Sequence, residues 1–429
     1  MKTFHKISGF INKHRIFILV VVIFAIHVFL RFYQLEERGQ FSWDQVDFAW
    51  NAKNIIVNHR FPLIGMVARQ DAGFNMGPGY YYLTAFFYWI FNLDPIASPL
   101  LAGLTSIITF FTLFYIAKKL FSEKVALVAL FIHTFSYYVI GFDGIQWSVN
   151  FIAPISLAIF YALYNVLVEK PKYLIMLALL LGLSFHIHFT LIFYPIIIFL
   201  TLPFIPRNKQ TLKYAFLSLP FFLVWFVPTF IHELQRGSGQ LNSVVSFINN
   251  NYHGVHLKRI MQVSKDAFIE IEGIIFVKAL SFIKYLVLPA FLLIYNLTYR
   301  SREKIILSYL VMLWFLVPWI VFSLYKGSIS NYYFSSTRLP AIMIISYLII
   351  RLISLRKIYL TAPLILFALY YSWINTEAFL KTKIHGVRYY KAKGYRDVKE
   401  SRGNEFMYGA PDSYMYYYYS TKLYNWKWK

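Results

Sequence analysis

The run Ile16-Phe-Ile-Leu-Val-Val-Val-Ile-Phe-Ala-Ile-His-Val-Phe-Leu30 decides the class of fold, because it is the first of many long apolar runs in the chain. Lys13 and Arg15 precede it, and Arg31-Phe-Tyr33 follows without a small-residue cleavage pattern. A cleaved secretory signal peptide ends in such a pattern. The run is therefore predicted to be a retained signal anchor.

The composition extends this prediction to the whole chain. Of 429 residues, 59% are hydrophobic and only 14% are charged, whereas soluble domains have about 25% charged residues. Apolar stretches of nearly 20 residues indicate membrane-spanning helices, so we predict an all-α polytopic membrane protein. The chain has no cysteine, which excludes disulfides, thiolate metal sites and a cysteine nucleophile. The net charge is +23. The positions of the basic residues along the chain indicate that they set the membrane topology, and they do not indicate nucleic-acid binding.

Basic residues alternate with uncharged loops along the chain. The loops Gly141–Asn150 and Phe185–Thr190 contain no Lys or Arg. Loops with an excess of Lys and Arg stay on the cytosolic side, so the N-terminus is predicted to be cytosolic. The basic clusters between apolar runs are Lys118/Lys119/Lys124, Lys170/Lys172, Arg207/Lys209/Lys213, Arg300/Arg302/Lys304 and Arg351/Arg356/Lys357.

This alternation gives about 11 transmembrane helices. An odd number places the C-terminus outside a cell (inner or cytoplasmic) membrane. The predicted spans are Ile16–Leu30, Ile96–Ala117, Val125–Ile140, Val149–Val168, Tyr173–Phe185, Phe189–Phe204, Tyr214–Ile231, Phe282–Leu297, Ile305–Leu324, Leu339–Ile350 and Ile358–Ile374.

Two domains follow from this topology. Residues 1–374 form the transmembrane domain, which includes a first outer loop (31–92) and a second long outer loop (232–278). Tyr80–Phe91 is rich in aromatic residues, and Leu257–Ile275 alternates apolar and charged positions. Both are predicted to be outer helices lying along the membrane interface. Residues 375–429 form a short basic, tyrosine-rich outer tail, too short for a sizeable core of its own.

The acids of the outer loops are candidates for chemistry. Asp44 follows Ser42, which can cap a helix. Its carboxylate is either a first-turn acid favoured by the helix dipole or a general base that takes a proton from an acceptor hydroxyl. Asp143 is the only charge in its loop and is either a turn residue next to Gly144 or a second acid at one shared site. The second reading requires that its loop fold toward the first loop.

Histidines are the other candidates. His186 and His188 lie in a turn between two spans, where they can bind a phosphate or a metal or lie in interfacial water. His232-Glu233 is either a metal-ligand pair or a helix cap, and no His-Glu-x-x-His motif occurs. Nucleotide-binding glycine motifs are also absent from the sequence, so no nucleotide cofactor is expected.

Several motifs in a fixed order suggest a family. They are Met76-Gly-Pro-Gly-Tyr-Tyr-Tyr82, Ala117–Phe121, Gln146-Trp-Ser-Val-Asn150, His188-Phe-Thr190 and Pro228–Glu233. In this order they resemble the GT-C superfamily of polyprenyl-phosphate-dependent glycosyltransferases. The most similar branch is glycosyltransferase family 39 with its relatives, the aminoarabinose transferases and protein O-mannosyltransferases. The motifs carry the resemblance over residues 31–190, and topology alone carries it elsewhere.

The resemblance implies an enzyme that transfers a hexosyl- or pentosyl-type sugar. Its partners would be an undecaprenyl or other polyprenyl-phosphate sugar donor, membrane lipids and a lipid, glycan or protein acceptor. The acceptor group is a hydroxyl, an amine or a phosphate on the extracytoplasmic face, in the synthesis of cell-envelope glycan, glycolipid or glycoprotein.

The resemblance also assigns residues. Asp44 and Asp143 correspond to the family's acids, although Gln45 stands where the family often has a second carboxylate. His188 corresponds to a Lys/His position near the donor phosphate, while His232 and Glu233 lie in a loop that supplies a metal ligand, so a divalent metal ion is a candidate cofactor. The expected substrate-binding residues are His186, His188, Arg60, Arg69 and Tyr81.

Two other functions are also compatible with the sequence. A lipid-linked oligosaccharide flippase or transporter would also be polytopic, although such carriers tend to have paired halves, and the sequence has no such repeat. A polymerase or ligase of surface polysaccharide is chemically close to a glycosyltransferase. Transfer of sugar, as opposed to movement of lipid, distinguishes the enzymes from the carrier.

Overall fold

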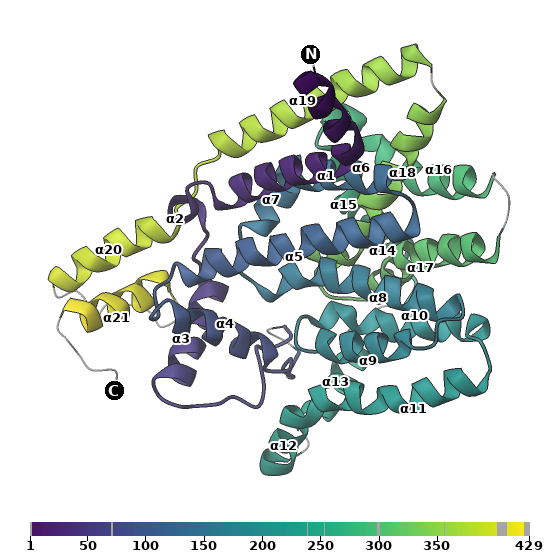
Figure 1. The fold of residues 1–429 in the computed structure, drawn as a ribbon. Coiled ribbons are helices and arrows are strands. Elements are labelled where there is room, and N and C mark those ends of the chain that lie inside the picture. The colour runs from purple at the N-terminus through teal and green to yellow at the C-terminus, as the bar shows by residue number, and fades with distance from the viewer. Residues whose placement is uncertain are drawn as a thin grey trace.

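The computed structural model describes residues 2–69, 72–237, 239–252, 254–297, 301–355, 357–400 and 410–423. Throughout these ranges the regular structure is helical, and the only β pairings are three isolated bridges. Figure 1 shows a bundle of long helices, among them α1 (Lys2–Phe32), α5 (Ala97–Leu120) and α19 (Ile358–Lys381). The all-α prediction is confirmed.

Six helical segments are long and apolar enough to cross a membrane, counted over the described residues. They are His14–Phe32 within α1, α5, Ser148–Leu167 (η1, Ser148–Phe151, with α8, Ile152–Leu167), Lys209–Arg236 (α11, Lys209–Leu223, with η4, Val224–Phe226, and α12, Val227–Arg236), α17 (Arg302–Leu324) and Asn331–Ser354 (η6, Asn331–Thr337, with α18, Arg338–Ser354).

Two further helix pairs are apolar enough but sharply bent, so each is either a broken span or a re-entrant loop. α6 (Glu123–Phe135) meets α7 (Tyr137–Asp143) at 70°. The other pair bends by 120° and joins Leu257–Ile275 to Leu280–Asn296. It comprises α14 (Leu257–Asp266), α15 (Ile269–Ile275), η5 (Lys278–Ile283) and α16 (Lys284–Asn296).

The structure therefore supports six to eight spans, and the predicted number of 11 is not confirmed. The run 173–185 forms α9 (Tyr173–Ser184), which has 12 residues. At 1.5 Å per residue such a helix reaches about 18 Å, short of a hydrocarbon core of about 30 Å. The run 189–204 is broken into η2 (Phe189–Ile192), α10 (Phe193–Thr201) and η3 (Leu202–Phe204). The run 358–374 lies in α19, which is not one of the six segments that are long and apolar enough to cross a membrane.

Leu257–Ile275 is not one helix on the surface, which corrects a prediction. It divides into α14 and α15, and Glu270 of α15 has no exposed surface. The Glu270 carboxylate accepts from Arg338 Nε over 2.6 Å inside the bundle. The alternation of apolar and charged residues predicts an amphipathic surface helix, but the acid has a buried cationic partner on α18 that sequence spacing does not reveal.

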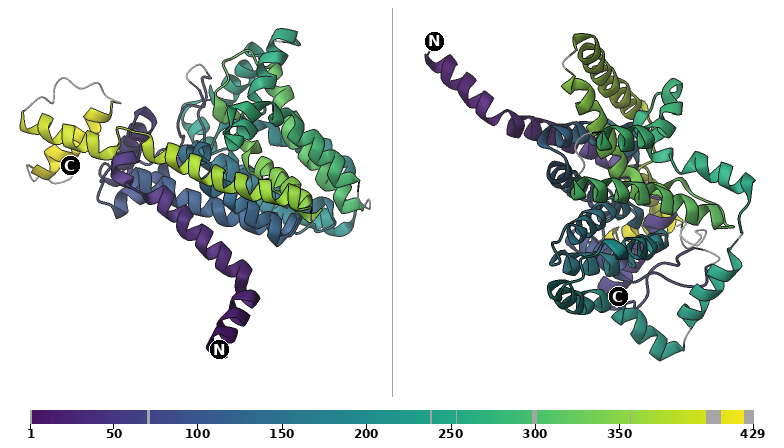
Figure 2. Two further views of the ribbon diagram at one scale, coloured as in Figure 1. Left: turned by 90° about the horizontal axis from the view of Figure 1, so that it is seen from above. Right: turned by 90° about the vertical axis from the view of Figure 1, so that its right-hand side faces the viewer.

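The first loop and the tail form a second hydrophobic core at one end of the molecule. α2 (Leu35–Arg38), α3 (Trp43–Ile56) and α4 (Gly79–Ile90) lie there beside α20 (Val387–Lys399) and α21 (Pro411–Leu423), as Figures 1 and 2 show. Phe41 and Phe48 are buried together with Tyr414 and Tyr418. The tail thus shares the core of the first loop.

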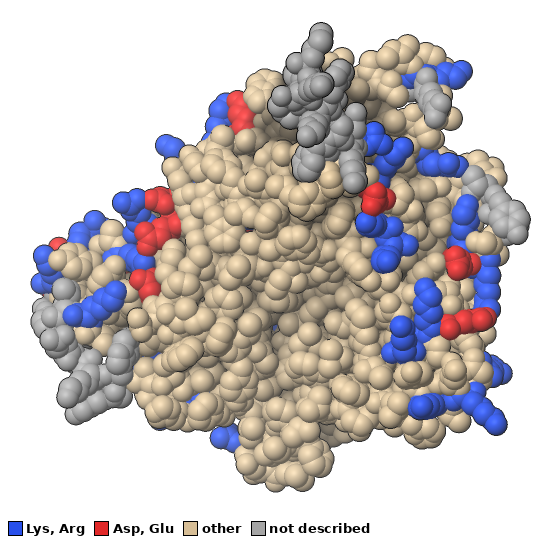
Figure 3. Space-filling view, in the orientation of Figure 1, with Lys and Arg blue, Asp and Glu red and all other residues tan. Residues whose placement is uncertain are grey.

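Charged side chains gather toward two opposite ends of the face drawn in Figure 3, and a broad uncharged band separates them. Such a band is the surface that a protein presents to hydrocarbon. α4 carries exposed Tyr82, Phe86 and Trp89 on one side. An interfacial position for α4 stays a prediction.

Candidate functional site

Asp44 is held at the start of α3 by a capping interaction. The Ser42 N–H donates to Gln45 Oε1 over 3.0 Å, so the first turn of the helix is closed by side chains. Gln45 Nε2 then donates to the Gln146 carbonyl over 2.6 Å. The loop Gly141–Asn150 therefore does fold against the start of α3, as the shared-site reading of the two acids required.

A polar cavity of about 670 Å³ opens beside Asp44. Four segments that are remote in sequence form its walls: the first loop, the loop after α7, the turn after α9 and the segment after α17. The lining residues are Asp44, Met66, Val67, Ala68, Arg69, Met76, Trp147, Ser148, Val149, Ile187, His188, Ser328, Ser330, Tyr332 and Tyr333. Of the predicted site residues, the cavity brings together Asp44, Arg69 and His188.

The protein around this cavity changes the acidity of its carboxylates. Asp44 remains accessible to solvent, but the concave walls replace much of its water, and this burial raises the pKa of Asp44. Burial also raises the pKa of Asp47, one turn further along α3, and the nearby Asp44 charge adds to the rise. The Tyr81 hydroxyl donates to Asp47 Oδ2 over 2.9 Å. Tyr81 thus positions a carboxylate, and a raised pKa suits a general base.

His188 is buried at the rim of the cavity as a neutral ring. Burial lowers the pKa of His188 to about 3. Its Nδ1 accepts from the Thr190 N–H over 3.2 Å and lies 2.9 Å from Thr190 Oγ1. Because Nδ1 accepts a backbone N–H, the proton of the neutral imidazole resides on Nε2. His188 therefore offers an uncharged N–H donor, which differs from the cationic role suggested by its correspondence to a Lys/His position.

His186 has a different environment from its neighbour. Its Nδ1 accepts from the Gly79 N–H and its Nε2 donates to the Trp225 carbonyl, both over 2.8 Å. A Cβ on Gly77 would lie 2.4 Å from His186 Nδ1. Gly77 and Gly79 thus allow the corner before α4 to close on the imidazole. With both ring nitrogens engaged, His186 holds this corner, and neither nitrogen is left to bind a phosphate.

The two arginines of the first loop also differ. Arg69 lines the cavity, donates to the Tyr325 hydroxyl and reaches Ser328 Oγ over 3.2 Å. Its guanidinium is a cation within the cavity wall. Arg60 is exposed just beyond α3 and is not part of the lining.

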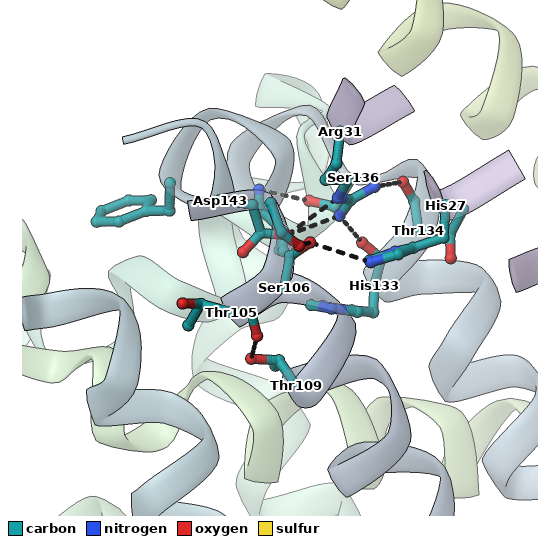
Figure 4. Close-up of polar contacts among 12 residues, drawn as sticks. His27, Arg31, Thr105, Ser106, Thr109, His133, Thr134, Ser136 and Asp143 are labelled. Atoms are coloured by element: carbon teal, nitrogen blue, oxygen red, sulfur yellow. Dashed lines mark hydrogen bonds and ion pairs between the residues drawn. The ribbon is translucent and has the colours of Figure 1, made fainter. Parts of the chain in front are cut away.

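Asp143 lies in a buried ion pair at the other side of its loop (Figure 4). Arg31 Nε and Nη2 each donate to Asp143 Oδ2 over 3.0 Å. The same guanidinium donates to the carbonyls of His133 and Thr134 over 2.7 and 2.5 Å. The cluster ties the end of α1 to α6 and α7. Asp143 does not line the Asp44 cavity, so the two acids lie in separate sites.

The described residues do not make a metal site. No group of three His, Asp or Glu side chains is close enough to hold an ion in that part of the chain. His232 and Glu233 both lie on α12, and Glu233 Oε1 accepts from the Gln240 N–H over 3.2 Å. Because two side chains on one helix are too few ligands for a metal centre, no chemistry is assigned to a metal here.

An apolar groove meets the polar cavity, which sequence reasoning did not predict. It has a volume of about 1000 Å³, and Met76 and His188 line both spaces. Its other walls come from α9 to α11, α13 (Gly239–Asn250) and the end of α17, including Leu181, Phe185, Phe189, Phe199, Phe222, Phe226, Val244, Phe247 and Phe322. Its residues come from distant helices, so no local motif marks it.

Comparison with known proteins supports the family resemblance. Residues 75–232 match the family described as dolichyl-phosphate-mannose-protein mannosyltransferase. The structure is similar to ArnT from Cupriavidus metallidurans bound to undecaprenyl phosphate, with a TM-score of 0.57 and 13% identity over 95% of this chain and 75% of ArnT. No curated protein sequence matches the chain.

Archaeal oligosaccharyltransferase structures are also similar. The Archaeoglobus fulgidus enzyme tethered with an acceptor peptide has a TM-score of 0.54 and 14% identity over 96% of this chain and 59% of its own. The same enzyme, AglB, in complex with an inhibitory peptide and a dolichol-phosphate has a TM-score of 0.52 and 13% identity, with coverages of 95% and 60%. The chain thus spans about three fifths of the archaeal enzyme, and the predicted resemblance to the GT-C superfamily is confirmed in its fold.

Proposed function

We propose that this protein is a membrane glycosyltransferase that moves a sugar from a polyprenyl-phosphate donor to an acceptor hydroxyl. The observation that carries the proposal is the junction at His188 and Met76 of an apolar groove with the polar Asp44 cavity. A polyprenyl-phosphate sugar has a long apolar chain, a charged phosphate and a polyhydroxylated ring. The groove matches the chain, and the cavity matches the phosphate and the sugar.

The reaction is a single displacement at the anomeric carbon. Asp44 takes the proton of the acceptor hydroxyl as its oxygen bonds to that carbon. The bond from the anomeric carbon to the phosphate oxygen breaks, and its electron pair leaves with the polyprenyl phosphate. Attack opposite to the leaving group inverts the configuration. The displacement requires no covalent sugar–enzyme intermediate.

Two side chains would stabilise the leaving phosphate. The Nε2–H of His188 is a neutral donor at the junction of groove and cavity, and Arg69 adds a positive charge in the cavity wall. Fixed donors aimed at developing negative charge lower the barrier more in a partly desolvated site than in water. Arg69 is itself held by Tyr325 and Ser328, so it is oriented before the donor arrives.

We also propose that the reaction takes place on the extracytoplasmic face of the cell membrane, in the synthesis of a cell-envelope glycan or glycoconjugate. The support is the distribution of basic residues in the sequence. Lys118, Lys119 and Lys124 flank the connection from α5 to α6, at the helix ends opposite the first loop. By the positive-inside rule, α3, the cavity and the tail would then be outside, with the N-terminus in the cytosol.

Reconstitution tests the function directly. Proteoliposomes that contain the full chain are supplied with radiolabelled undecaprenyl-phosphate sugars and with extracts of envelope acceptors. Label that moves from the lipid to an acceptor supports the proposal. Lipid that crosses the bilayer with its sugar still attached would indicate a carrier and overturn it.

A further inference from the structure

A third cavity adjoins the other two and has a different chemistry. Its volume is about 680 Å³, and it lies between α13, the first loop and the segment after α17. Its lining is rich in amides and hydroxyls: Ala72, Gly73, Asn242, Ser243, Ser246, Phe247, Asn250, Asn251, Lys326 and Gly327. We propose that this amide cavity binds the non-reacting part of a saccharide acceptor. The inference rests on the proposed glycosyltransfer and names its acceptor class.

α13 separates the amide cavity from the apolar groove. Asn242, Ser246 and Asn250 recur every fourth residue, so they share one face of the helix. Val244 and Ile248, on another face, line the groove, and Phe247 and Asn251 line both spaces. One helix thus presents side-chain amides and hydroxyls to one space and mainly apolar side chains, with Asn249 among them, to the space assigned to the lipid.

Two loops connect the amide cavity with the site of reaction. In the first loop, Arg69 lines the Asp44 cavity, whereas Ala72 and Gly73 line the amide cavity. In the segment after α17, Ser328 lines the Asp44 cavity and Gly327 lines the amide cavity. Because Arg69 Nη2 donates to Ser328 Oγ over 3.2 Å, the two loops are joined where the cavities meet. An acceptor in the amide cavity would therefore have one end beside the Asp44 cavity.

The lining favours a saccharide over a peptide. Amide and hydroxyl side chains both donate and accept, as the hydroxyls of a sugar require. The Phe247 ring at the edge offers an apolar surface for the C–H face of a pyranose. An open strand edge is one device that binds an extended peptide, and α13 does not offer it, because its backbone is engaged in its own helix.

The position of α13 is fixed independently of any ligand. Gln240 Oε1 accepts from the Asn75 N–H over 2.7 Å, and its Nε2 donates to Asn75 Oδ1 over 3.3 Å. These bonds tie the start of α13 to the first loop. The amide face is therefore held opposite Gly73 before an acceptor arrives, which limits the ordering cost of binding.

A cysteine-protection experiment tests the assignment, because the natural chain has no cysteine. The full-length Ser246→Cys variant in nanodiscs is treated with a membrane-permeant maleimide. The probes are neutral trisaccharides of mannose, glucose and N-acetylglucosamine, and a serine/threonine-containing hexapeptide. A saccharide should slow labelling at this position about threefold or more. The matched control is Val245→Cys, because Val245 is 51% exposed and lines neither space.

The second arm combines Asn242→Ala and Asn250→Ala with Ser246→Cys. The saccharide concentration that gives half-protection should rise about tenfold, whereas Leu241→Ala, on an exposed apolar position, should leave it unchanged. No protection by any of the three saccharides, or protection by the peptide alone, would overturn the inference.

The two proposals can fail separately. Protection needs no donor, so saccharide protection without sugar transfer would remove only the proposed function. Transfer of sugar without saccharide protection would remove only the acceptor assignment.

Discussion

Two aspartates predicted to lie in outer loops, Asp44 and Asp143, have opposite surroundings in this protein. Asp44 is at the wall of a cavity, accessible to solvent, with its pKa raised by the protein around it. Asp143 is buried, and its Oδ2 accepts two hydrogen bonds from the Arg31 guanidinium that pairs with its charge. A carboxylate that is already paired is a poor proton acceptor, while one that is accessible and partly desolvated is a suitable base. The partner of an acid, more than the loop in which it lies, therefore decides its use.

The largest expected effect comes from removing the proposed base. Asp44→Asn should lower the rate of sugar transfer by about 10²–10⁴-fold, because the amide does not accept the acceptor proton. The thermal midpoint should stay close to that of the wild type, since Asp44 is at the solvent-accessible start of a helix. Transfer kinetics in proteoliposomes and differential scanning fluorimetry measure the two quantities.

Glu377→Gln is the matched control for this substitution. It neutralises an exposed acid whose pair with Lys381 spans one turn of α19, and such pairs contribute little to stability. Its rate should be normal. A normal rate for Asp44→Asn as well would move the role of base to Asp47.

Asp143→Asn should instead act on stability. It leaves Arg31 buried without its ionic partner, which costs about 3–5 kcal/mol. The unfolding transition in a chemical denaturant should shift accordingly, while the rate per folded molecule changes little. The double variant Arg31→Met/Asp143→Leu should regain much of the stability, because neither charge remains. A large loss of rate in a stably folded Asp143→Asn protein would give Asp143 a direct role.

A smaller effect is expected at His188. The hydrogen bond from its Nε2–H to a charged phosphate is worth about 1.5–3 kcal/mol, so His188→Ala should weaken donor binding by about 10- to 150-fold. His188→Gln should retain more affinity than His188→Lys, because the side chain at this position is a buried neutral donor and burial disfavours a charged one. Binding of undecaprenyl phosphate measures this order. Higher affinity for His188→Lys would show that the site needs a cation.

The pH dependence of kcat/KM also distinguishes Asp44 from His188, and its expected effect is smaller than that of the substitutions above. Since burial raises the pKa of Asp44, the ionised base is lost at a higher pH than for an ordinary aspartate. The kcat/KM should therefore fall on acidification below this raised pKa. The pKa of His188 lies near 3, so its ring stays neutral across this range. The acid limb should coincide in wild type and His188→Gln. A limb that moves with His188→Gln would contradict the neutral assignment.

A topology experiment, with little expected effect on the rate, tests which side of the membrane holds the Asp44 cavity. Lys119→Cys and Ala392→Cys introduce single cysteines at exposed positions at opposite ends of the molecule. An impermeant maleimide should label Ala392→Cys from outside intact cells and Lys119→Cys only after the membrane is opened. Labelling of both from one side would overturn the topology and the extracytoplasmic assignment.

The amino-acid sequence determined the class of the protein. Apolar runs of nearly 20 residues indicate helices that cross a bilayer. The order of motifs from Met76 to Glu233 predicted the fold that the comparisons confirmed. The sequence also selected Asp44 and His188 as candidates, because polar groups near a membrane surface are few. These are local properties, set by composition, period and neighbouring residues.

Only the tertiary structure decided how the candidates are used. Asp143 meets Arg31 across 112 residues of chain, His186 contacts the Gly79 corner across 107, and Glu270 meets Arg338 across 68. The apolar groove, the Asp44 cavity and the amide cavity are likewise built from distant segments. A sequence pattern records spacing along one helix or loop, whereas burial and ionic partners depend on which helices pack together. The function of each polar residue is therefore fixed by its packing as well as by its type.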